Sequence, residues 1–273
     1  MRVSTLLAAL AVSFAVLEAT HAVWAGEERI NVAMSRCGRM SLSRSRHSIA
    51  VIEPGLFETP WRGASLAGSA VAEPRGNIRF GRIISPGGTE VECETKTDFN
   101  GDRLSASYRL VPKADIYLNS FHVAVVFPAG VLRGGKYVAD GEDGRFPMDF
   151  GNIVLRSGQT RNLSITTAEG VTLAFKFARP VHLLLQDDRK WGPSFTVRIG
   201  AQTDGKTPWP KGKALEVEFE LLSSEGMTVE YDEQVAITAG AEWIPLKLEL
   251  DVESGSALDF SGISGVRAPA GAY

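Results

Sequence analysis

Apolar and polar residues alternate along several segments of the chain. The clearest alternating segments are residues 78–83, 91–95, 104–110, 215–221 and 246–250. A period of two places apolar side chains on one face of a strand and polar side chains on the other, so these segments predict half-buried antiparallel strands. Two other runs, residues 121–127 and 181–185, alternate less and are more continuously apolar. They predict central strands covered on both faces. The chain is therefore predicted to be all-β.

Turn sequences separate the predicted strands. Asn100-Gly101 is the strongest hairpin signal in the chain, because both residues accept a positive φ angle at low cost. Similar residues form the other predicted turns, Pro86-Gly87-Gly88, Ala168-Glu169-Gly170 and Ser224-Glu225-Gly226. Turns at such short intervals are typical of a large sandwich in which two antiparallel sheets pack face to face.

One sandwich domain is expected to occupy most of the chain. We expect a signal peptide at residues 1–25, an irregular lead-in with one or two strands at 26–76, the sandwich at 77–254, and a loose tail at 255–273. The lead-in mixes arginines and serines with glycine and proline, and its clearest strand is near residues 48–52. The tail is rich in Gly, Ser and Ala and is expected to pack poorly by itself.

The start of the chain has the pattern of a secretory signal peptide. Arg2 supplies a positive charge, residues 3–17 are mostly apolar, and Ala22 and Ala25 offer two cleavage points. The alternative is a retained N-terminal anchor, although a spanning helix needs about 20 apolar residues. The sequence therefore predicts a secreted or periplasmic protein without membrane contact once the signal is cleaved.

The charge of the chain argues against a nucleic-acid partner. The net charge is −3 at pH 7, and removing residues 1–25 leaves it unchanged because Arg2 and Glu18 cancel. Nucleic-acid binding depends on clustered lysines and arginines that neutralise phosphates. A weakly acidic surface of mixed charge does not provide them.

The sequence contains no complete catalytic or metal-binding motif. His47, His122 and His182 lie in different predicted strands and lack the spacing of a zinc site. Residues 98–102 begin like a calcium loop, but the twelfth position is not acidic, which favours a plain hairpin. A Gly-x-Ser-x-Gly elbow and a phosphate-binding glycine loop are also missing. We therefore expect no catalytic residue, metal or cofactor in this chain.

The most distinctive polar stretch is residues 185–192, between two strong predicted strands. Tryptophan rings pack against the C–H faces of sugars, and Asp, Gln and Arg side chains bond hydroxyl groups in fixed directions. The candidate carbohydrate-binding residues are Gln186, Asp187, Asp188, Arg189, Trp191, Trp209 and Trp61. The alternative is a structured turn in which Trp191 packs on the edge of the sandwich and Arg189 pairs with Asp187 or Asp188.

The two cysteines, Cys37 and Cys93, both follow the predicted signal peptide. An oxidising compartment permits a disulfide between them, which would stabilise the fold by about 4 kcal/mol in the chain-entropy model. Two separate buried thiols are the alternative, and the sequence alone leaves both open.

Several segments together resemble a known family. They are residues 117–123, 127–128, 134–141, 146–147, the stretch Gln186-Asp187-Asp188-Arg189-Lys190-Trp191-Gly192, residues 197–200 and 255–261, and Ala268-Pro269-Ala270-Gly271. This pattern resembles the non-catalytic N-terminal β-sandwich of large secreted bacterial glycoside-hydrolase-like proteins, a sandwich similar to the galactose-mutarotase-like supersandwich. The resemblance covers residues 78–273. It implies a C-terminal catalytic domain that is absent from this chain, and the catalytic residues of the mutarotases have no counterpart here.

Three functions remain open at this point. The leading hypothesis is a non-catalytic accessory domain of a secreted carbohydrate-active protein, in contact with polysaccharide or oligosaccharide. The second is a glycan epimerase, lyase or hydrolase that uses a concave sheet face, which converging titratable groups would favour. The third is an envelope or adhesion module without sugar affinity, which a buried Trp191 would favour.

Overall fold

The computed structural model describes residues 29–66 and 76–231, all within one compact unit of the chain. The predicted signal peptide, the tail and the strand at 246–250 lie outside the described residues. Within them, no helix is long and apolar enough to cross a bilayer.

The described elements are almost all strands. In chain order they are β1 (Ile30–Met34), β2 (Met40–Arg44), β3 (His47–Glu58), β4 (Arg62–Ser65), β5 (Ile78–Ile84), β6 (Glu90–Asn100), β7 (Arg103–Pro112), β8 (Leu118–Pro128), α2 (Ala129–Leu132), β9 (Lys136–Ala139), β10 (Glu142–Arg145), β11 (Val154–Thr166), β12 (Thr172–Asp187), the 3₁₀ turn η1 (Asp188–Lys190), β13 (Ser194–Gln202), β14 (Leu215–Ser223) and β15 (Met227–Tyr231).

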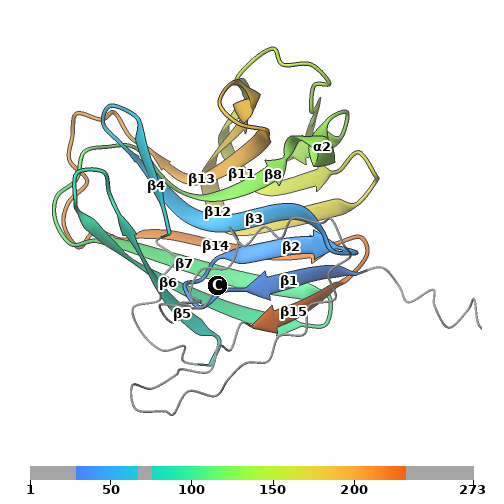
Figure 1. The fold of residues 1–273 in the computed structure, drawn as a ribbon, viewed down its shortest axis with the longest axis horizontal. Helices are drawn as coiled ribbons and strands as arrows, with labels where there is room; N and C mark the ends of the chain where they lie inside the picture. The colour runs from blue at the N-terminus through green and yellow to red at the C-terminus, as the bar shows by residue number, and fades with distance from the viewer. Residues whose placement is uncertain (1–28, 67–75, 232–273) are drawn as a thin grey trace, which may run out of the picture. The chain divides into compact units, whose positions relative to one another are not determined.

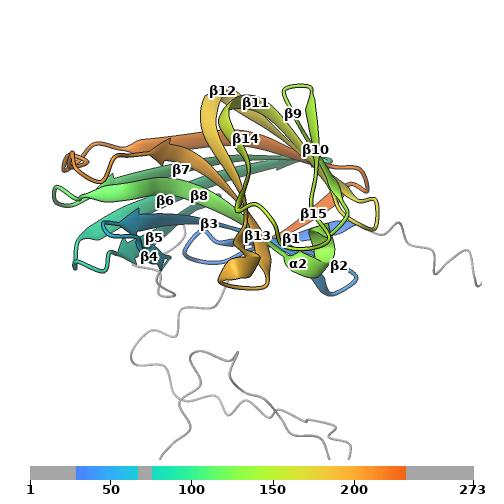
Figure 2. The same cartoon turned by 90° about the horizontal axis from the view of Figure 1, so that it is seen from above.

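These strands form one curled sheet of 15 strands (Figures 1 and 2). Its main path runs β15-β1-β2-β3-β8-β13-β12-β14-β7-β6-β5, and β4, β9, β10 and β11 pair beside that path. The described pairs are antiparallel except for β1 with β15, which is parallel. The predicted all-β sandwich is therefore confirmed, as a curled sheet whose two halves form the layers. The predicted Asn100-Gly101 turn joins β6 to β7, and Gly101 has a φ angle of 64°.

The long strand β12 carries the chain from one layer to the other. Its residues 173–177 pair with β14, whereas its residues 183–187 pair with β13. Between these halves residues 178–180 are exposed, and Pro180 has no N–H to donate to a ladder. The neighbouring strand β11 has a register irregularity at the same level, between Thr160 and Asn162. Strands that change layer through such bends are a general way to build the corner of a sandwich.

Apolar side chains from both layers meet in one large core. Val32 from β1, Phe127 from β8 and Phe175 from β12 are all buried in it. The rings of Tyr108 and Phe219 lie 6.3 Å apart at its centre. The run at 121–127 lies in β8, between β3 and β13, and is buried almost throughout, as predicted for a central strand. The run at 181–185 in β12 alternates between buried and half-buried residues, so the prediction that both of its faces are covered is wrong.

Residues 30–65 contain more strands than the sequence pattern predicted. The expected irregular lead-in forms β1, β2, β3 and β4. Pro54 and Gly55 look like strand breakers, yet both lie inside β3, where they pair with Val123 and His122 of β8. The strands β1 and β2 are short, and their pairing partners include β15, far along the chain. Such long-range pairing leaves no local signal.

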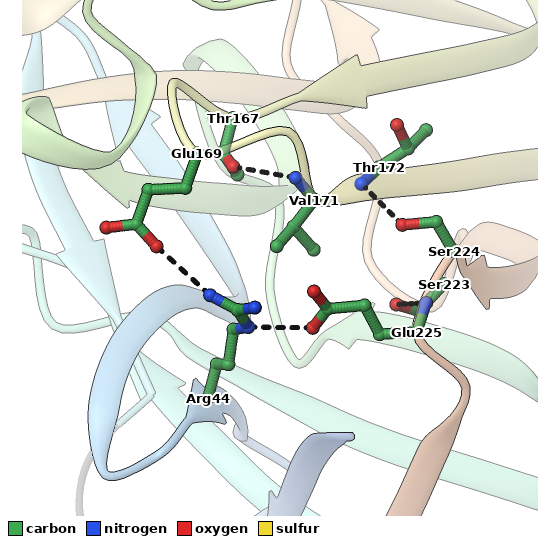
Figure 3. A network of polar contacts seen from close by, with 8 residues as sticks. All are labelled: Arg44, Thr167, Glu169, Val171, Thr172, Ser223, Ser224 and Glu225. Carbon is green, nitrogen blue, oxygen red and sulfur yellow. Dashed lines mark hydrogen bonds and ion pairs between the residues drawn. The ribbon is translucent and has the colours of Figure 1, made fainter. Parts of the chain in front are cut away.

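Arg44, at the end of β2, ties together two turns of the opposite layer (Figure 3). Its Nε donates to Glu225 Oε2 at 2.8 Å, and its Nη1 donates to Glu169 Oε2 at 3.3 Å. In the same network the Thr172 amide donates to Ser224 Oγ at 3.0 Å. The β2–β3 end is thereby fixed to the turns that follow β11 and β14.

We expect the two carboxylates to contribute unequally to stability. The side chain of Glu225 is 23% exposed and that of Glu169 is 77% exposed, so solvent screens the second pair more strongly. Glu225→Gln should lower the free energy of unfolding by about 0.5–1 kcal/mol, and Glu169→Gln by less than about 0.3 kcal/mol. Urea unfolding of both variants measures this, and a larger loss for Glu169→Gln would contradict it.

Candidate functional site

The outward face of β3, β8 and β13 carries polar side chains close together. Across these neighbouring strands (Figure 1), Glu53 pairs with Ala124, and Ala124 pairs with Arg198. Adjacent strands lie about 4.8 Å apart, so the backbones of Glu53 and Arg198 are about 10 Å apart, with only the alanine between them. In the next row His122 lies between Gly55 and Gly200. Small residues thus alternate with large polar ones.

This arrangement leaves a groove of about 470 Å³, which we name the sheet-face groove. The residues that define it are Glu53, Gly55, Phe57, His122, Ala124, Asp188, Thr196 and Arg198. A Cβ on Gly55 would lie 3.3 Å from both His122 Nε2 and the carbonyl oxygen of Ala64, so a side chain there would require these neighbours to shift by a few tenths of an ångström. The floor is open because its central positions carry small side chains, and charged groups stand on both sides.

His122 is a neutral imidazole in the floor of the groove. Its Nδ1 lies 2.8 Å from Ser120 Oγ, and its ring stacks on Phe57 with a centroid distance of 5.8 Å. Burial, with the nearby positive charge of Arg198, lowers the pKa of His122 to about 3. The ring therefore keeps one N–H donor and one acceptor at neutral pH.

Asp188 and Arg198 form an ion pair at the side of the groove. Asp188 Oδ2 accepts a hydrogen bond from Arg198 Nη2 at 3.2 Å. The guanidinium carbon of Arg198 lies 5.0 Å from the centroid of Phe57, so the cation also rests on an aromatic face. Burial lowers the pKa of Arg198, and the negative charge of Asp188 opposes that effect.

The second carboxylate oxygen of Asp188 has no hydrogen-bond donor among the described residues. Asp188 is only 9% exposed, and its Oδ1 atom is buried. A buried acceptor without a partner is uncommon in folded proteins, because it loses its bond to water without replacement. The Oε1 atom of Gln186, whose residue pairs with Thr196 of the groove, is also buried and unpartnered.

Glu53 stands on the opposite side of the floor. Its Oε2 accepts from Arg39 Nε at 2.7 Å, and its side chain is 18% exposed. The groove is therefore lined by the carboxylates of Glu53 and Asp188 and by the guanidinium of Arg198. In the described part of the chain, no group of three or more His, Cys, Asp and Glu side chains has the arrangement of a metal site.

Asp187 and Arg189 of the 185–192 stretch have a structural role. Asp187 is fully buried, and its two oxygens accept from Arg189 at 2.8 and 2.7 Å. Arg189 also donates to the carbonyl oxygens of Met148 and Pro147. Burial raises the pKa of Asp187, but the hydrogen bonds from Arg189 outweigh it and hold that pKa below its usual value. The predicted pairing of Arg189 with Asp187 is present, and it serves the fold.

The three candidate tryptophans lie in different surroundings. Trp191 is 65% exposed and does not pack on the sandwich edge. Trp61 is 61% exposed in the turn between β3 and β4. Trp209 is partly buried: its Nε1 donates to the carbonyl of Lys213 at 2.8 Å, and its ring meets Phe121 edge-on. Trp61 and Trp191 are thus the more exposed rings, with Phe57 5.9 Å from the first and Lys190 Nζ 5.6 Å from the second.

The sequence pattern gave no role to Glu53, Phe57 or Arg198, and none to His122. The available signal was a polar residue at an outward position of a predicted strand, which is also where ordinary solvated side chains occur. The register that places these four residues together joins β3, β8 and β13, which are far apart in sequence. Cys37 and Cys93 are both buried, and both are free thiols in the structure.

No family model matches the chain, and no curated protein matches it. Among solved structures, the GH36 α-galactosidase AgaA from Geobacillus stearothermophilus is similar at 11% identity and a TM-score of 0.42, over 64% of this chain and 30% of that chain. AgaB from the same organism has 11% identity and a TM-score of 0.40, over 66% and 28%.

The protein Slr1438 from Synechocystis sp. PCC 6803 is similar at 9% identity and a TM-score of 0.34, over 68% of this chain and 89% of that chain. This chain spans less than a third of the length of the α-galactosidases. All three TM-scores are below 0.5, so these likenesses decide neither the family nor the function.

The buried imidazole should make stability depend on pH. The unfolded chain protonates His122 near its ordinary pKa of about 6.5, whereas the folded chain keeps it neutral down to about pH 3. Stability from this residue is therefore complete above pH 6.5 and is lost as the pH falls towards 3, by about 1.4 kcal/mol per unit.

Urea unfolding between pH 4 and 7 tests this expectation. His122→Gln should reduce the slope of the free energy of unfolding against pH by the amount that corresponds to about one bound proton. The control is His47→Gln, at an exposed position, which should leave the dependence as in the parent. An unchanged slope in His122→Gln would show that the ring titrates normally in the fold.

Proposed function

We propose that this chain is a non-catalytic β-sandwich accessory domain of a secreted carbohydrate-active protein, and that its sheet-face groove contacts a neutral glycan. The Asp188 carboxylate at the groove carries this proposal, because its Oδ1 atom is buried without a donor, and a side-chain rotation that exposes it would let a ligand supply the missing bond. Gln186 Oε1 adds a second such acceptor beside Thr196. Sugar hydroxyls are donors of this kind.

The charge of the groove supports a neutral ligand. Its carboxylates, Glu53 and Asp188, each have an arginine partner, Arg39 and Arg198. No cation is left over in this set to attract an anionic group, and no carboxylate is left to attract a cation. Recognition then rests on hydrogen bonds and on aromatic contact, as in sites that bind uncharged polar ligands.

The two exposed tryptophans support an extended ligand. Trp191 precedes the first residues of β13, and Trp61 follows the last residues of β3. Both strands run antiparallel to β8, with Ser194 opposite Pro128 and Glu58 opposite Leu118, so the two tryptophans flank opposite ends of this sheet face, about 30 Å apart along the strands. Trp61 also has a φ angle of 81°, a left-handed backbone that costs free energy in a residue other than glycine.

Affinity electrophoresis on a panel of neutral polysaccharides tests the glycan contact. Trp61→Ala and Asp188→Ala should each weaken retention by about three- to tenfold, because they remove a stacking face and an acceptor. The same should hold for Trp191→Ala, at the other end of the sheet face.

Leu222→Ala is the matched control for these variants. Leu222 is an exposed apolar residue on β14, in the other layer, and its removal should leave retention unchanged. If all three groove variants migrate like the parent chain on every polysaccharide that retards it, the groove is not the contact surface.

A second candidate function is a glycan-acting enzyme, since Glu53 and Asp188 line the same groove. Paired carboxylates are the usual groups of glycoside hydrolysis. His122 would contribute little as a base, because its pKa of about 3 leaves it weakly basic.

Release of reducing sugar separates the two candidates. The accessory proposal expects no turnover above a blank by the purified chain on the polysaccharides that it binds. Turnover that disappears in both Glu53→Gln and Asp188→Asn, while binding persists, would establish the enzyme instead.

The adhesion module without sugar affinity has less support. A buried Trp191 would have favoured it, and that ring is 65% exposed.

A further inference from the structure

The two cysteines come from segments that the sheet places at opposite ends of its main path. Cys37 lies in the turn between β1 and β2, and Cys93 lies in β6. Both belong to the same small hydrophobic cluster, where they are 6% and 2% exposed. The curl of the sheet therefore brings the two thiols into one buried patch.

Gly81 shows how closely the two cysteines approach. It pairs with Cys93 across the β5–β6 ladder. A Cβ built on Gly81 would lie 2.5 Å from the carbonyl oxygen of Cys37 and 3.3 Å from its Cβ. Cys37 thus fills the space that a side chain opposite Cys93 would occupy. A Cβ on Gly81 would lie about 4.5–5.5 Å from that of Cys93, and Cys37 Cβ is 3.3 Å from the same point, so the two cysteine Cβ atoms are within about 9 Å of each other. A disulfide brings them to about 3.5–4.5 Å.

The electrostatics of the patch agree with this proximity. Burial raises the pKa of the Cys93 thiol, and the neighbouring Cys37 raises it further. Each thiol has a weak polar neighbour: Cys37 Sγ lies 3.3 Å from Ser35 Oγ, and Cys93 Sγ lies 3.7 Å from the carbonyl oxygen of Val91. Neither contact would prevent a rotation of the side chain about its χ1 angle.

We propose that Cys37 and Cys93 form a disulfide that fastens the β1–β2 turn to β6. The oxidant is a disulfide, either oxidised glutathione or a thiol–disulfide oxidoreductase. One cysteine thiolate attacks it and forms a mixed disulfide while a thiolate leaves; the other cysteine thiolate then displaces the second thiolate. Each cysteine loses one proton, and two electrons pass to the oxidant.

The bond is made before the hydrophobic cluster closes. In the folded chain both thiols are shielded from an oxidant, and the raised pKa of Cys93 keeps it protonated. The bond then adds a covalent link where Tyr108 Oη already donates to the carbonyl of Gly38 at 3.2 Å. The bond thereby stabilises the curled sheet where the β1–β2 turn meets β6, near the two ends of the strand order.

Refolding of the full chain in a glutathione buffer tests the proposal. After denaturation, the refolded protein should have no thiol that reacts with an alkylating reagent. Peptide mapping should find the Cys37 and Cys93 peptides linked within one chain, with the loss of two hydrogens. Two alkylated cysteines per chain, or links only between chains, would overturn the proposal.

A thermal melt supplies the second readout. The oxidised parent should melt on the order of 5–10 °C above the reduced parent. Cys37→Ala/Cys93→Ala is the matched control, and its melting temperature should be the same with and without reductant. An equal melting temperature for the oxidised and reduced parent would contradict a fastening role.

Discussion

The bend in the β11–β12 hairpin is the constraint on which the rest of the structure depends. β12 pairs with β14 through residues 173–177 and with β13 through residues 183–187, so one strand belongs to both layers. The apolar faces of the two halves can bury each other only because the ladder is relaxed around residues 178–180. A straight β12 would continue a flat sheet and leave one face of its core in water.

Because the sheet is curled, its first and last strands come together and are held by side-chain contacts. Side chains join the two ends of the path. Thr97 Oγ1 of β6 and Tyr231 Oη of β15 lie 3.2 Å apart, and the guanidinium carbon of Arg79 in β5 lies 4.9 Å from the centroid of the Tyr231 ring. Arg44 performs the same task at the turns, and the proposed Cys37–Cys93 bond would act nearby. The stability of the fold is thus concentrated where segments distant in sequence meet.

The neighbouring residues Asp187 and Asp188 have different roles, the first in the fold and the second at the groove. Asp187 ends β12 facing the interior and is neutralised by Arg189, whereas Asp188 begins η1, pairs with Arg198 and has one buried oxygen without a donor among the described residues. The members of the candidate stretch therefore divide between structure and surface. Trp61 lies at the far end of the same face because β3 and β13 run in the same direction. No local pattern could connect it with Asp188.

The sequence by itself determined the alternating strands after residue 77 and several tight turns, because period-two alternation and residues that accept positive φ angles act within a few positions of the chain. One interpretation of the 185–192 stretch paired Arg189 with Asp187 or Asp188, and the structure has the pair with Asp187. Only the tertiary structure decided that residues 30–65 complete the sheet and that Glu53, His122 and Arg198 share one groove. These facts depend on the register between distant strands, which is fixed by the mutual burial of apolar faces across the whole curl and has no local signature.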